Sequence, residues 1–331
     1  MAKPRQPNQL EASWREKDLV NGKVSDTIVF ILRTSGCQWA IRSGGCSMCG
    51  YRQASMESIT EDDLNSQVDQ MSSRFKGEPF VKIYTSGSFL DTNEVPLSIR
   101  ARILSMFQSC ERVLFESRPE YVTEEAVATL TKNVTIAFGL ESSNDRILSR
   151  SVRKGFSPED VRTAALIAKG AGLGVRSYLL LKPLYLSESM AIRDSLDSAV
   201  FADEFSDEIS INPLNVQRGT DVELAWRHGD FRSPWVWSLV EVMREASGKV
   251  QARVMSSPSG GGSQRGVHNC GKCDSMLLES IERFSFSQDS KDLDVDCDCK
   301  LKWREYIKAE DIIGTSSNLD RGFSNLLIIN E

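Results

Sequence analysis

Short apolar runs rich in β-branched residues recur along the first part of the chain, and a stretch with helical periodicity follows most of them. The runs are continuously apolar and do not alternate with polar residues, which is typical of parallel strands buried on both faces. Strands are predicted at residues 27–33, 80–84, 112–115, 134–138, 174–181 and 208–211. Six strands that alternate with helices predict an α/β fold, namely a partial, TIM-like (β/α)6 barrel that is open on one side.

Helix start signals support the same alternation. Thr60, with Asp63 three residues later, forms a capping-box-like pair, and Ser157 followed by Pro158 opens another helix. The predicted helices span residues 60–75, 95–110, 123–130, 157–170 and 187–205. The segment before the first strand is polar, and we expect an arm or a short helix at residues 11–18.

The pattern changes after Arg218. Ser233 and Pro234 start a helix, residues 250–255 are a candidate strand, and residues 256–266 are a mobile linker or loop rich in glycine and serine. Two more helices are expected, one ending near residue 284 and one at residues 302–309. We therefore divide the chain into an N-terminal arm (1–26), a partial barrel (27–220) and a C-terminal extension (221–331).

Composition is ordinary for a soluble globular protein, with 40% hydrophobic and 26% charged residues among 331. A net charge of −6 gives no overall basic footprint for nucleic acid, so a polyanion would need local patches. No apolar run approaches the roughly 20 residues of a membrane span, and Met1–Asn8 lacks the apolar core of a signal peptide. We expect a cytoplasmic protein with no membrane partner, where clustered cysteines indicate metal sites and not disulfides.

Residues 34–51, TSGCQWAIRSGGCSMCGY, hold three of the eight cysteines: Cys37, Cys46 and Cys49. The glycines of this loop permit positive φ and let the backbone approach a cluster closely. A [4Fe–4S] cluster normally takes four cysteine ligands, so three would leave one iron open for a substrate or cofactor. The spacing alone also fits a three-ligand zinc site or a redox C-x-x-C.

A second cysteine group lies near the C-terminus. It consists of Cys270, Cys273, Cys297 and Cys299, which supply four thiolates, enough for a tetrahedral zinc ion. His268 is a possible substitute ligand, because the C-x-C spacing of the second pair is unusual. A second iron–sulfur cluster and free thiols are the alternatives. The neighbouring residues 259–265 could contact phosphate, or could be a flexible loop.

Four segments together resemble a known family. They are Ser35 to Cys37, Gly44 to Tyr51, Gly261 to Gly266, and His268 to Cys299. From about residue 27 to the C-terminus, the chain resembles the radical S-adenosylmethionine (SAM) superfamily, its Elongator-catalytic-subunit-like branch, and within that branch the RaSEA family of archaeosine biosynthesis. The first cysteine gap is wider than the superfamily's common C-x3-C-x2-C, and Met48 replaces a frequent aromatic residue near adenine, so that contact must differ.

The resemblance implies a [4Fe–4S] cluster on the cysteine loop and a set of SAM-binding residues at strand ends. Gly87 and Ser88 correspond to the turn whose backbone receives the amino group of SAM. Glu116 and Glu141 would hold the amino group and the ribose hydroxyls, and Arg153 would hold the carboxylate. Carboxylates accept from ammonium and hydroxyl groups, and arginine pairs bidentately with carboxylate. Singly, each residue could equally be part of a surface ion pair.

The resemblance also implies a reaction. In the family, SAM and the cluster generate a 5′-deoxyadenosyl radical, and the substrate is a tRNA whose D-loop deazaguanine carries a lysine attached by the transferase ArcS. Hydrogen removal beside the linking nitrogen would let the C–N bond fragment and leave the formamidine of archaeosine. Lys182 and Arg218, each at a strand end, are candidates for holding the lysine carboxylate, and a purely structural role is the alternative for each. Asn212, Asn215 and Gln217 could contact the base edge or the lysine. An electron donor and a zinc-bound module facing tRNA are also implied.

Two other readings of the sequence remain. One is a radical SAM enzyme that modifies another tRNA base, such as a wobble uridine, although the chain leaves no room after residue 331 for the acetyltransferase domain of those enzymes. The other is a non-catalytic zinc-binding α/β protein that binds RNA, with both cysteine groups structural. Iron colour and SAM cleavage would distinguish an enzyme from such a binding protein.

Overall fold

The computed structural model describes residues 6–313 of the chain. These residues divide into two compact units, and the chain passes between them several times. The first unit comprises residues up to 45 together with 51–139 and 159–176, and the second comprises 46–50, 140–158 and the residues from 177 onward. The division falls inside the cysteine loop, with Cys37 in the first unit and Cys46 and Cys49 in the second.

The first unit begins with a hairpin. Strand β1 (Ala12–Val20) pairs antiparallel with β2 (Lys23–Ile31), and Val20 lies opposite Lys23. Asn21 and Gly22 connect them with φ values of 50° and 76°, as a type I′ turn requires. The helix expected at residues 11–18 is therefore wrong. The Asn-Gly pair between two strand-like stretches was the sequence signal that should have corrected it.

Parallel strands follow the hairpin in chain order. They are β3 (Phe80–Tyr84), β4 (Arg112–Glu116) and β5 (Val134–Glu141), paired β2–β3, β3–β4 and β4–β5. The strand order β1 to β8 is that of the chain. Apolar side chains such as Val81, Phe115 and Ile136 are fully or almost fully buried in these strands. The six predicted strands correspond to β2–β7, which confirms the α/β class.

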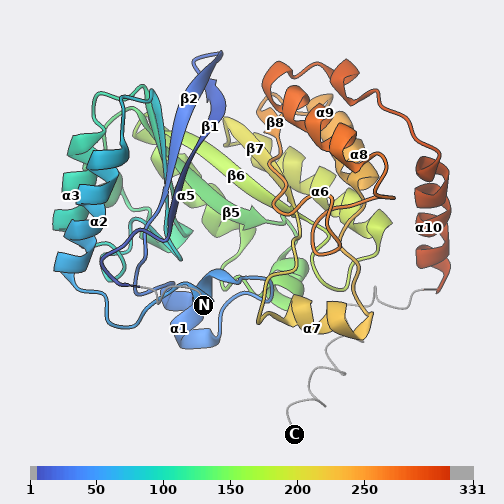
Figure 1. Cartoon of the computed structure of the whole chain (residues 1–331), viewed down its shortest axis with the longest axis horizontal. Helices are drawn as coiled ribbons and strands as arrows, with labels where there is room; N and C mark the ends of the chain where they lie inside the picture. Colours follow the sequence, from blue (N-terminus) through green and yellow to red (C-terminus); the bar gives the residue numbers. More distant parts are fainter. Residues whose placement is uncertain (1–5, 314–331) are drawn as a thin grey trace, which may run out of the picture. The chain divides into compact units, whose positions relative to one another are not determined.

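Helices of the first unit follow the expected pattern. They are α1 (Gln38–Ser43), α2 (Glu61–Arg74), α3 (Leu97–Met106), α4 (Glu124–Ala128) and α5 (Pro158–Gly170). Thr60 caps α2, and its hydroxyl and backbone N–H bond Asp63 reciprocally, which confirms the predicted capping box. Helices α2 and α3 lie side by side in Figure 1.

The second unit holds the remaining strands and helices. They are β7 (Glu208–Pro213), β8 (Arg253–Met255), α6 (Glu188–Asp203), α7 (Asp221–His228), α8 (Val236–Ser247), α9 (Asp274–Ser287) and α10 (Cys299–Ile313), with a π-helical turn at Ile147–Val152. Strand β6 (Gly174–Leu181) runs from the first unit into the second. Strands β7 and β8 pair in parallel, α6 packs against α8 and α10, and α8 lies beside α9 (Figure 1).

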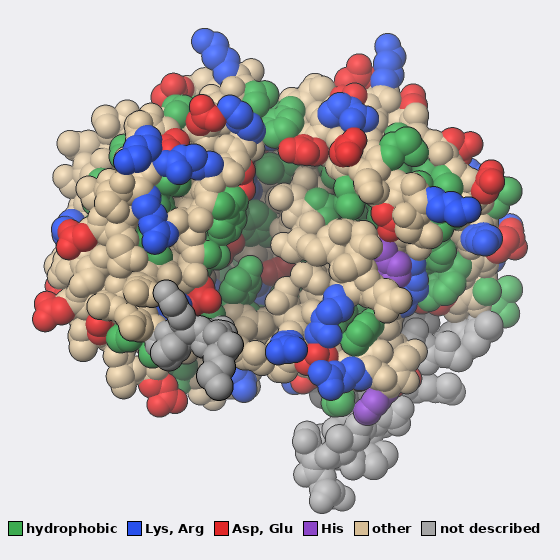
Figure 2. Space-filling view, viewed as in Figure 1, with side chains coloured by type: hydrophobic (Ala, Val, Ile, Leu, Met, Phe, Trp, Pro, Cys, Tyr) green, Lys and Arg blue, Asp and Glu red, His purple; other side chains and the backbone are tan. Residues whose placement is uncertain are grey.

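Besides β1 and several short 3₁₀ helices, three elements had not been predicted: α1, the π-helical turn and α7. Each is short, with six, six and eight residues, so hydrophobic periodicity gives little signal. On the face shown in Figure 2, acidic and basic side chains are interspersed, in keeping with the modest net charge of −6. Among residues 6–313, none of the helices combines the length and hydrophobicity needed to cross a bilayer.

Candidate functional site

The first unit brings Cys37 together with the turn after β3. Cys37 precedes α1, and a Cβ placed on Gly87 would lie 2.7 Å from the Cα of Cys37 and 2.9 Å from its Cβ. Only glycine fits at such a separation, so the backbone of the predicted SAM-binding turn contacts the first predicted cluster ligand directly. Gly36, at φ 100°, is equally constrained against Ser55.

A buried carboxylate, Glu94, holds this turn in place. Its oxygens accept hydrogen bonds from the N–H groups of Gly87 (2.9 Å) and Ser88 (2.6 Å) and from the Thr34 hydroxyl (2.6 Å). Burial raises the pKa of Glu94, which is 2% exposed, and these hydrogen bonds oppose the rise. An ammonium only donates hydrogen bonds, so any role of this turn toward one falls to its carbonyl oxygens. No local motif indicates the role of Glu94, because its partners lie six to sixty residues away.

The ends of β3 and β4 are tied together beside this turn. The Ser88 hydroxyl accepts from the backbone N–H of Arg118 at 3.0 Å, and the Glu116 carbonyl accepts from Phe89 at 2.9 Å. Glu116 itself is half-buried at the end of β4. Four of the predicted site residues, Cys37, Gly87, Ser88 and Glu116, therefore gather at the carboxyl ends of strands in the first unit.

In the second unit, Cys46 and Cys49 form a tight turn in which the Cys49 N–H donates to the Cys46 carbonyl at 3.2 Å. Ser47 anchors the turn. Its hydroxyl donates to the Ser151 carbonyl at 2.6 Å, its N–H to Val152 at 3.0 Å, and its carbonyl accepts from Asp221 at 3.1 Å. The C-x-x-C is thus fixed to the π-helical turn and to the start of α7, two of the elements the sequence had not revealed.

Glu141 and Arg153 lie in the same unit, and both have left-handed backbone conformations, with φ of 66° and 60°. The Lys154 ammonium donates to Glu141 at 2.7 Å, and the Arg153 guanidinium pairs with Asp221. Non-glycine residues at positive φ cost about 1–3 kcal/mol each and are concentrated at functional sites. A guanidinium has five N–H donors, so the pairing with Asp221 is compatible with a second carboxylate.

Helix α6 fixes the segment that follows Glu141. The Ser142 hydroxyl donates to the Asp194 carboxylate at 2.6 Å, and the Ser143 N–H donates to the Ser198 hydroxyl at 2.7 Å. Burial raises the pKa of Asp194 to about 7, although the Ser142 hydrogen bond opposes this. The residue next to Glu141, Ser142, therefore bonds a carboxyl group whose pKa is close to 7.

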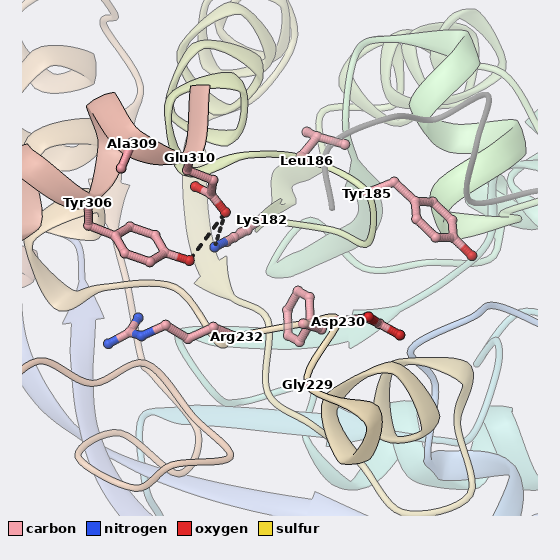
Figure 3. Close-up of a pocket in the computed structure, with 10 residues that line it drawn as sticks. Lys182, Tyr185, Leu186, Gly229, Asp230, Arg232, Tyr306, Ala309 and Glu310 are labelled. Atoms are coloured by element: carbon pink, nitrogen blue, oxygen red, sulfur yellow. Dashed lines mark hydrogen bonds and ion pairs between the residues drawn. The ribbon is translucent and has the colours of Figure 1, made fainter. Parts of the chain in front are cut away.

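Lys182 lines a cavity of about 270 Å³, drawn in Figure 3. Its ammonium lies 2.6 Å from Glu188 Oε2 and 3.5 Å from Glu310 Oε1, and the residue is 2% exposed. Burial lowers the pKa of Lys182, but the two carboxylates outweigh burial and the net direction is upward. Lys182 is therefore charged at neutral pH. Its backbone, at φ 62°, is also left-handed.

The other predicted substrate residues are placed less closely. Asn212 accepts from the Ser210 hydroxyl at 3.0 Å, Asn215 packs against Gly260, and Gln217 packs against Gly50 beside Cys49. Arg218 is exposed and does not line the cavity around Lys182. The structure thus brings Gln217 to the C-x-x-C turn, and it leaves the role of Arg218 as a prediction.

The four C-terminal cysteines converge on one point. Their sulfur atoms all lie within 4.8 Å of one another, with Cys270–Cys273 at 3.7 Å and Cys273–Cys299 at 3.5 Å. The Trp237 indole N–H donates to Cys299 Sγ at 3.2 Å and screens the group from one side. The His268 ring lies 2.8 Å from the Gly266 carbonyl through Nδ1 and is not part of this convergent set. Four soft donors at this spacing fit one tetrahedral metal ion.

The loop at residues 256–266 is packed and makes specific contacts. The Val216 N–H donates to the Arg265 carbonyl at 2.7 Å, and the Arg265 guanidinium donates back to Val216 O at 3.0 Å and to Glu223 at 2.6 Å. A Cβ on Gly266 would collide with the Gly260 carbonyl. The hydrogen bond from Arg265 lowers the pKa of Glu223 to about 2. Arg265 serves this internal pairing, which weakens the expectation that it contacts phosphate.

The chain is similar to characterised and uncharacterised archaeal proteins over nearly its whole length. It is 42% identical to archaeosine synthase subunit beta of Methanosarcina acetivorans, over 96% of this chain and 95% of that protein. It is 36% identical to archaeosine synthase subunit beta of Thermococcus kodakarensis, over 89% of this chain and 95% of that protein. No family model matches the chain.

Among solved structures, the chain is similar to Elp3 of Methanocaldococcus infernus, with a TM-score of 0.50 and 17% identity. The match covers 68% of this chain and 59% of the Elp3 chain. A likeness at this identity concerns the fold alone. It confirms the predicted α/β partial-barrel fold class.

Proposed function

Because the chain belongs to the archaeosine synthase subunit beta family, we propose that it is a radical SAM enzyme of archaeosine biosynthesis that acts on tRNA. The reaction is cleavage of the C–N bond in the lysine adduct on the D-loop 7-deazaguanine, at tRNA position 15, which leaves the formamidine of archaeosine. The observation that carries this proposal is the similarity to two archaeosine synthase subunits beta over about nine tenths or more of the chain.

Cys37, Cys46 and Cys49 would hold a [4Fe–4S] cluster. Gly87 approaches Cys37 closely, and Cys46 and Cys49 lie in one tight turn. Both arrangements suit a cluster, because no side chain intervenes between these thiols and the backbone segments that present them. Cluster and SAM, when bound, supply the radical that removes a hydrogen atom from the substrate. The protein itself would bind SAM and the substrate, orient them, and exclude water from the site.

SAM recognition would come from the strand ends described above. The carbonyl groups of the Gly87–Ser88 turn and the Glu116 carboxylate accept from its ammonium, Glu141 accepts from ribose hydroxyls, and Arg153 pairs with its carboxylate. The positive φ of Glu141 and Arg153 supports this assignment, since such strain is retained where a site requires it. Glu94 is a positioning residue for the turn.

Substrate binding would use the second unit. Lys182 donates to the carboxylate of the lysine adduct, and Arg218 is a further candidate for the same group. Asn212, Asn215 and Gln217 are placed after β7 to contact the base or the lysine. Gln217 has the strongest support, because it packs on Gly50, next to a cluster cysteine.

The four C-terminal cysteines would hold zinc. A single ion at about 2.3 Å from each sulfur requires sulfur–sulfur separations of about 3.8 Å. The sulfur–sulfur separations of 3.5, 3.7 and 4.0 Å agree with that requirement. The ion would stabilise a module that faces tRNA. Thiol iron sites share this chemistry, so metal analysis decides between them.

The name subunit beta, borne by the relatives, indicates a partner subunit, and we propose the lysine-attaching transferase ArcS for this role. An electron donor completes the set, and the enzyme would act in the cytoplasm with tRNA.

The test is anaerobic purification with visible and EPR spectroscopy, followed by incubation with SAM and lysine-bearing tRNA. A [4Fe–4S] signal that SAM perturbs, together with archaeosine formation, is expected for the wild type, and both should be lost in Cys46→Ala. Cys110→Ala is the matched control, since Cys110 is a buried thiol distant from both cysteine groups in sequence. Colourless protein with zinc in both groups after reconstitution would favour a non-catalytic RNA-binding protein. SAM cleavage that depends on a tRNA without the lysine adduct would indicate an enzyme that modifies a different tRNA base.

A further inference from the structure

The cavity beside Lys182 has the chemistry of a binding site for a small charged molecule. Its walls come from the loop after β6, from residues 229–232 and from α10, all in the second unit. At about 270 Å³ it lies just below the roughly 300–1,000 Å³ of sites for drug-sized ligands, so it suits something smaller. Figure 3 shows the Lys182 ammonium, the Glu310 carboxylate and the Tyr306 hydroxyl turned toward one another.

Two carboxylates flank Lys182, and they differ in how fully they are bonded. Glu188 accepts from Trp235 N at 2.7 Å, from the Ser238 hydroxyl at 2.6 Å and pairs with Lys182 at 2.6 Å, so it is a saturated counter-ion. Glu310 Oε1 has only long contacts, at 3.5 Å to Lys182 and 3.3 Å to Tyr306. Bonds at that length are weak, so Glu310 Oε1 is the oxygen that a donor from a ligand would use.

The cavity also has one carboxylate directed to solvent and one cation already in use. Asp230 is exposed and lines the cavity. The Arg232 guanidinium donates to the carbonyls of Ser233 (2.7 Å) and His268 (3.0 Å) and stacks on Trp235 at 4.1 Å. The Lys182 ammonium has three N–H donors and only one close partner, Glu188 at 2.6 Å, so a further donor remains for a ligand opposite the carboxylates Asp230 and Glu310. This balance disfavours phosphate groups and suits a zwitterion with one carboxylate and one ammonium.

Backbone strain marks the same loop. Lys182 and Tyr185 both have positive φ, at 62° and 69°, although neither is glycine. These two residues lie three positions apart, and the conformation is strained for any residue with a side chain, so the surrounding structure must impose it. Strain of this kind around a cavity is typical of a loop shaped for a ligand.

We propose that this cavity binds the free amino-acid end of the lysine carried by the substrate, with Lys182 donating to its α-carboxylate and Asp230 and Glu310 accepting from its α-ammonium. This inference rests on the proposed function, because the lysine is attached to the base through its side-chain amine and only its α-groups remain free. It adds the ammonium partners, which lie 48 and 128 residues from Lys182 in sequence. It also makes Tyr306 a positioning residue for Glu310.

The test measures binding and turnover separately. Isothermal titration of the reconstituted protein uses Nε-acetyl-lysine as the mimic of the attached lysine. N-acetylcadaverine, which lacks the carboxylate, and 6-acetamidohexanoate, which lacks the ammonium, are the comparison probes. The full mimic should bind more tightly than either probe. In turnover of lysine-bearing tRNA, Asp230→Asn and Glu310→Gln should raise KM roughly ten- to hundredfold with little change in kcat, as expected for one charged hydrogen bond.

Asp197→Asn is the matched control, because Asp197 is an exposed carboxylate on α6 that does not line the cavity. Asp230 is itself exposed, so its variant keeps the test valid even where Glu310→Gln impairs folding. Unchanged KM in the Asp230 variant, with equal affinity for all three probes, would overturn the inference while archaeosine formation continued. If wild-type enzyme made no archaeosine, the proposed function would fail, and selective binding of Nε-acetyl-lysine would still decide what the cavity recognises.

Discussion

The two cysteine groups of this chain are built in opposite ways. The sulfur atoms of the four C-terminal cysteines all lie within 4.8 Å of one another, and the indole of Trp237 donates a hydrogen bond to one of them. The three thiols of the loop are presented by backbone contacts, with Cys37 against Gly87 in one unit and Cys46 and Cys49 anchored by Ser47 in the other. The first arrangement suits an ion that stabilises structure, and the second suits a cofactor that must stay accessible to another molecule.

The largest expected effect concerns the loop. Cys49→Ala should abolish the iron–sulfur absorbance and reduce archaeosine formation to background, because the cluster would keep only two thiolate ligands. The melting temperature should change little, since the turn is held by Ser47 and not by the thiol. Visible spectra, a turnover assay and thermal melting check this. A large loss of thermal stability without loss of colour would reverse the roles we assign to the two groups.

The next effect concerns the C-terminal group. Cys299→Ala should remove one metal ion per chain and destabilise the protein by several kcal/mol, because structural zinc sites contribute folding free energy directly. Metal analysis and denaturant unfolding measure both quantities, with Cys110→Ala as the control for loss of a buried thiol. Iron in place of zinc, with loss of part of the visible absorbance, would mean that the second group also holds a cluster.

A smaller effect is expected at the turn after β3. Gly87→Ala would place a methyl group 2.7 Å from the Cα of Cys37, so the turn or the cysteine must shift. We expect incomplete cluster assembly and a rise in the KM for SAM of roughly tenfold, equivalent to about 1.4 kcal/mol. Iron quantification and SAM titration test this. Gly170→Ala is the control, because a Cβ there has no neighbour within 4 Å.

The smallest effect concerns Asp194, whose pKa burial raises to about 7. Because the folded pKa exceeds the unfolded value near 3.8, this group's contribution is present below about pH 4 and is lost as pH rises through 7. Asp194→Asn should therefore stabilise the protein at pH 8, by about 1–2 kcal/mol, below the roughly 4 kcal/mol that three pKa units represent. Unfolding at pH 5 and pH 8 measures it, and Asp197→Asn should weaken the effect, because the Asp197 charge helps to raise the pKa of Asp194. Equal pH dependence in variant and wild type would contradict the assignment.

Most of the sheet could be predicted from sequence because its strands are continuous apolar runs such as Phe80–Tyr84, whose burial pattern is uniform. Strand β1 could not, because Ala12–Val20 mixes charged and apolar residues and lies at a sheet edge, with one partner strand only. The cysteine group at 270–299 could be predicted because the two cysteines of each pair lie only two or three positions apart in the sequence.

The supporting residues were hidden for a different reason. Glu94 acts on Gly87 and Thr34, and Glu310 acts on Lys182, which is 128 residues away. Neither carboxylate stands in a motif, and single acidic residues are ordinary on a surface. Only the folded chain brings them to their partners, so these two supporting carboxylates could not be predicted from sequence motifs.

Helix α10 links the C-terminal cysteine group with the cavity beside Lys182. It begins at Cys299, in the metal group, and eleven residues later carries Glu310, in the cavity. At a rise of 1.5 Å per residue that separation is about 16 Å along a stiff rod. A tilt of about 5° at the cysteine end would displace the far end of such a helix by more than about 1 Å. A shift of that size is enough to break a hydrogen bond. A metal ion bound by the cysteine group would thus affect how tightly the cavity binds a ligand, through the position of Glu310 and without contacting that ligand.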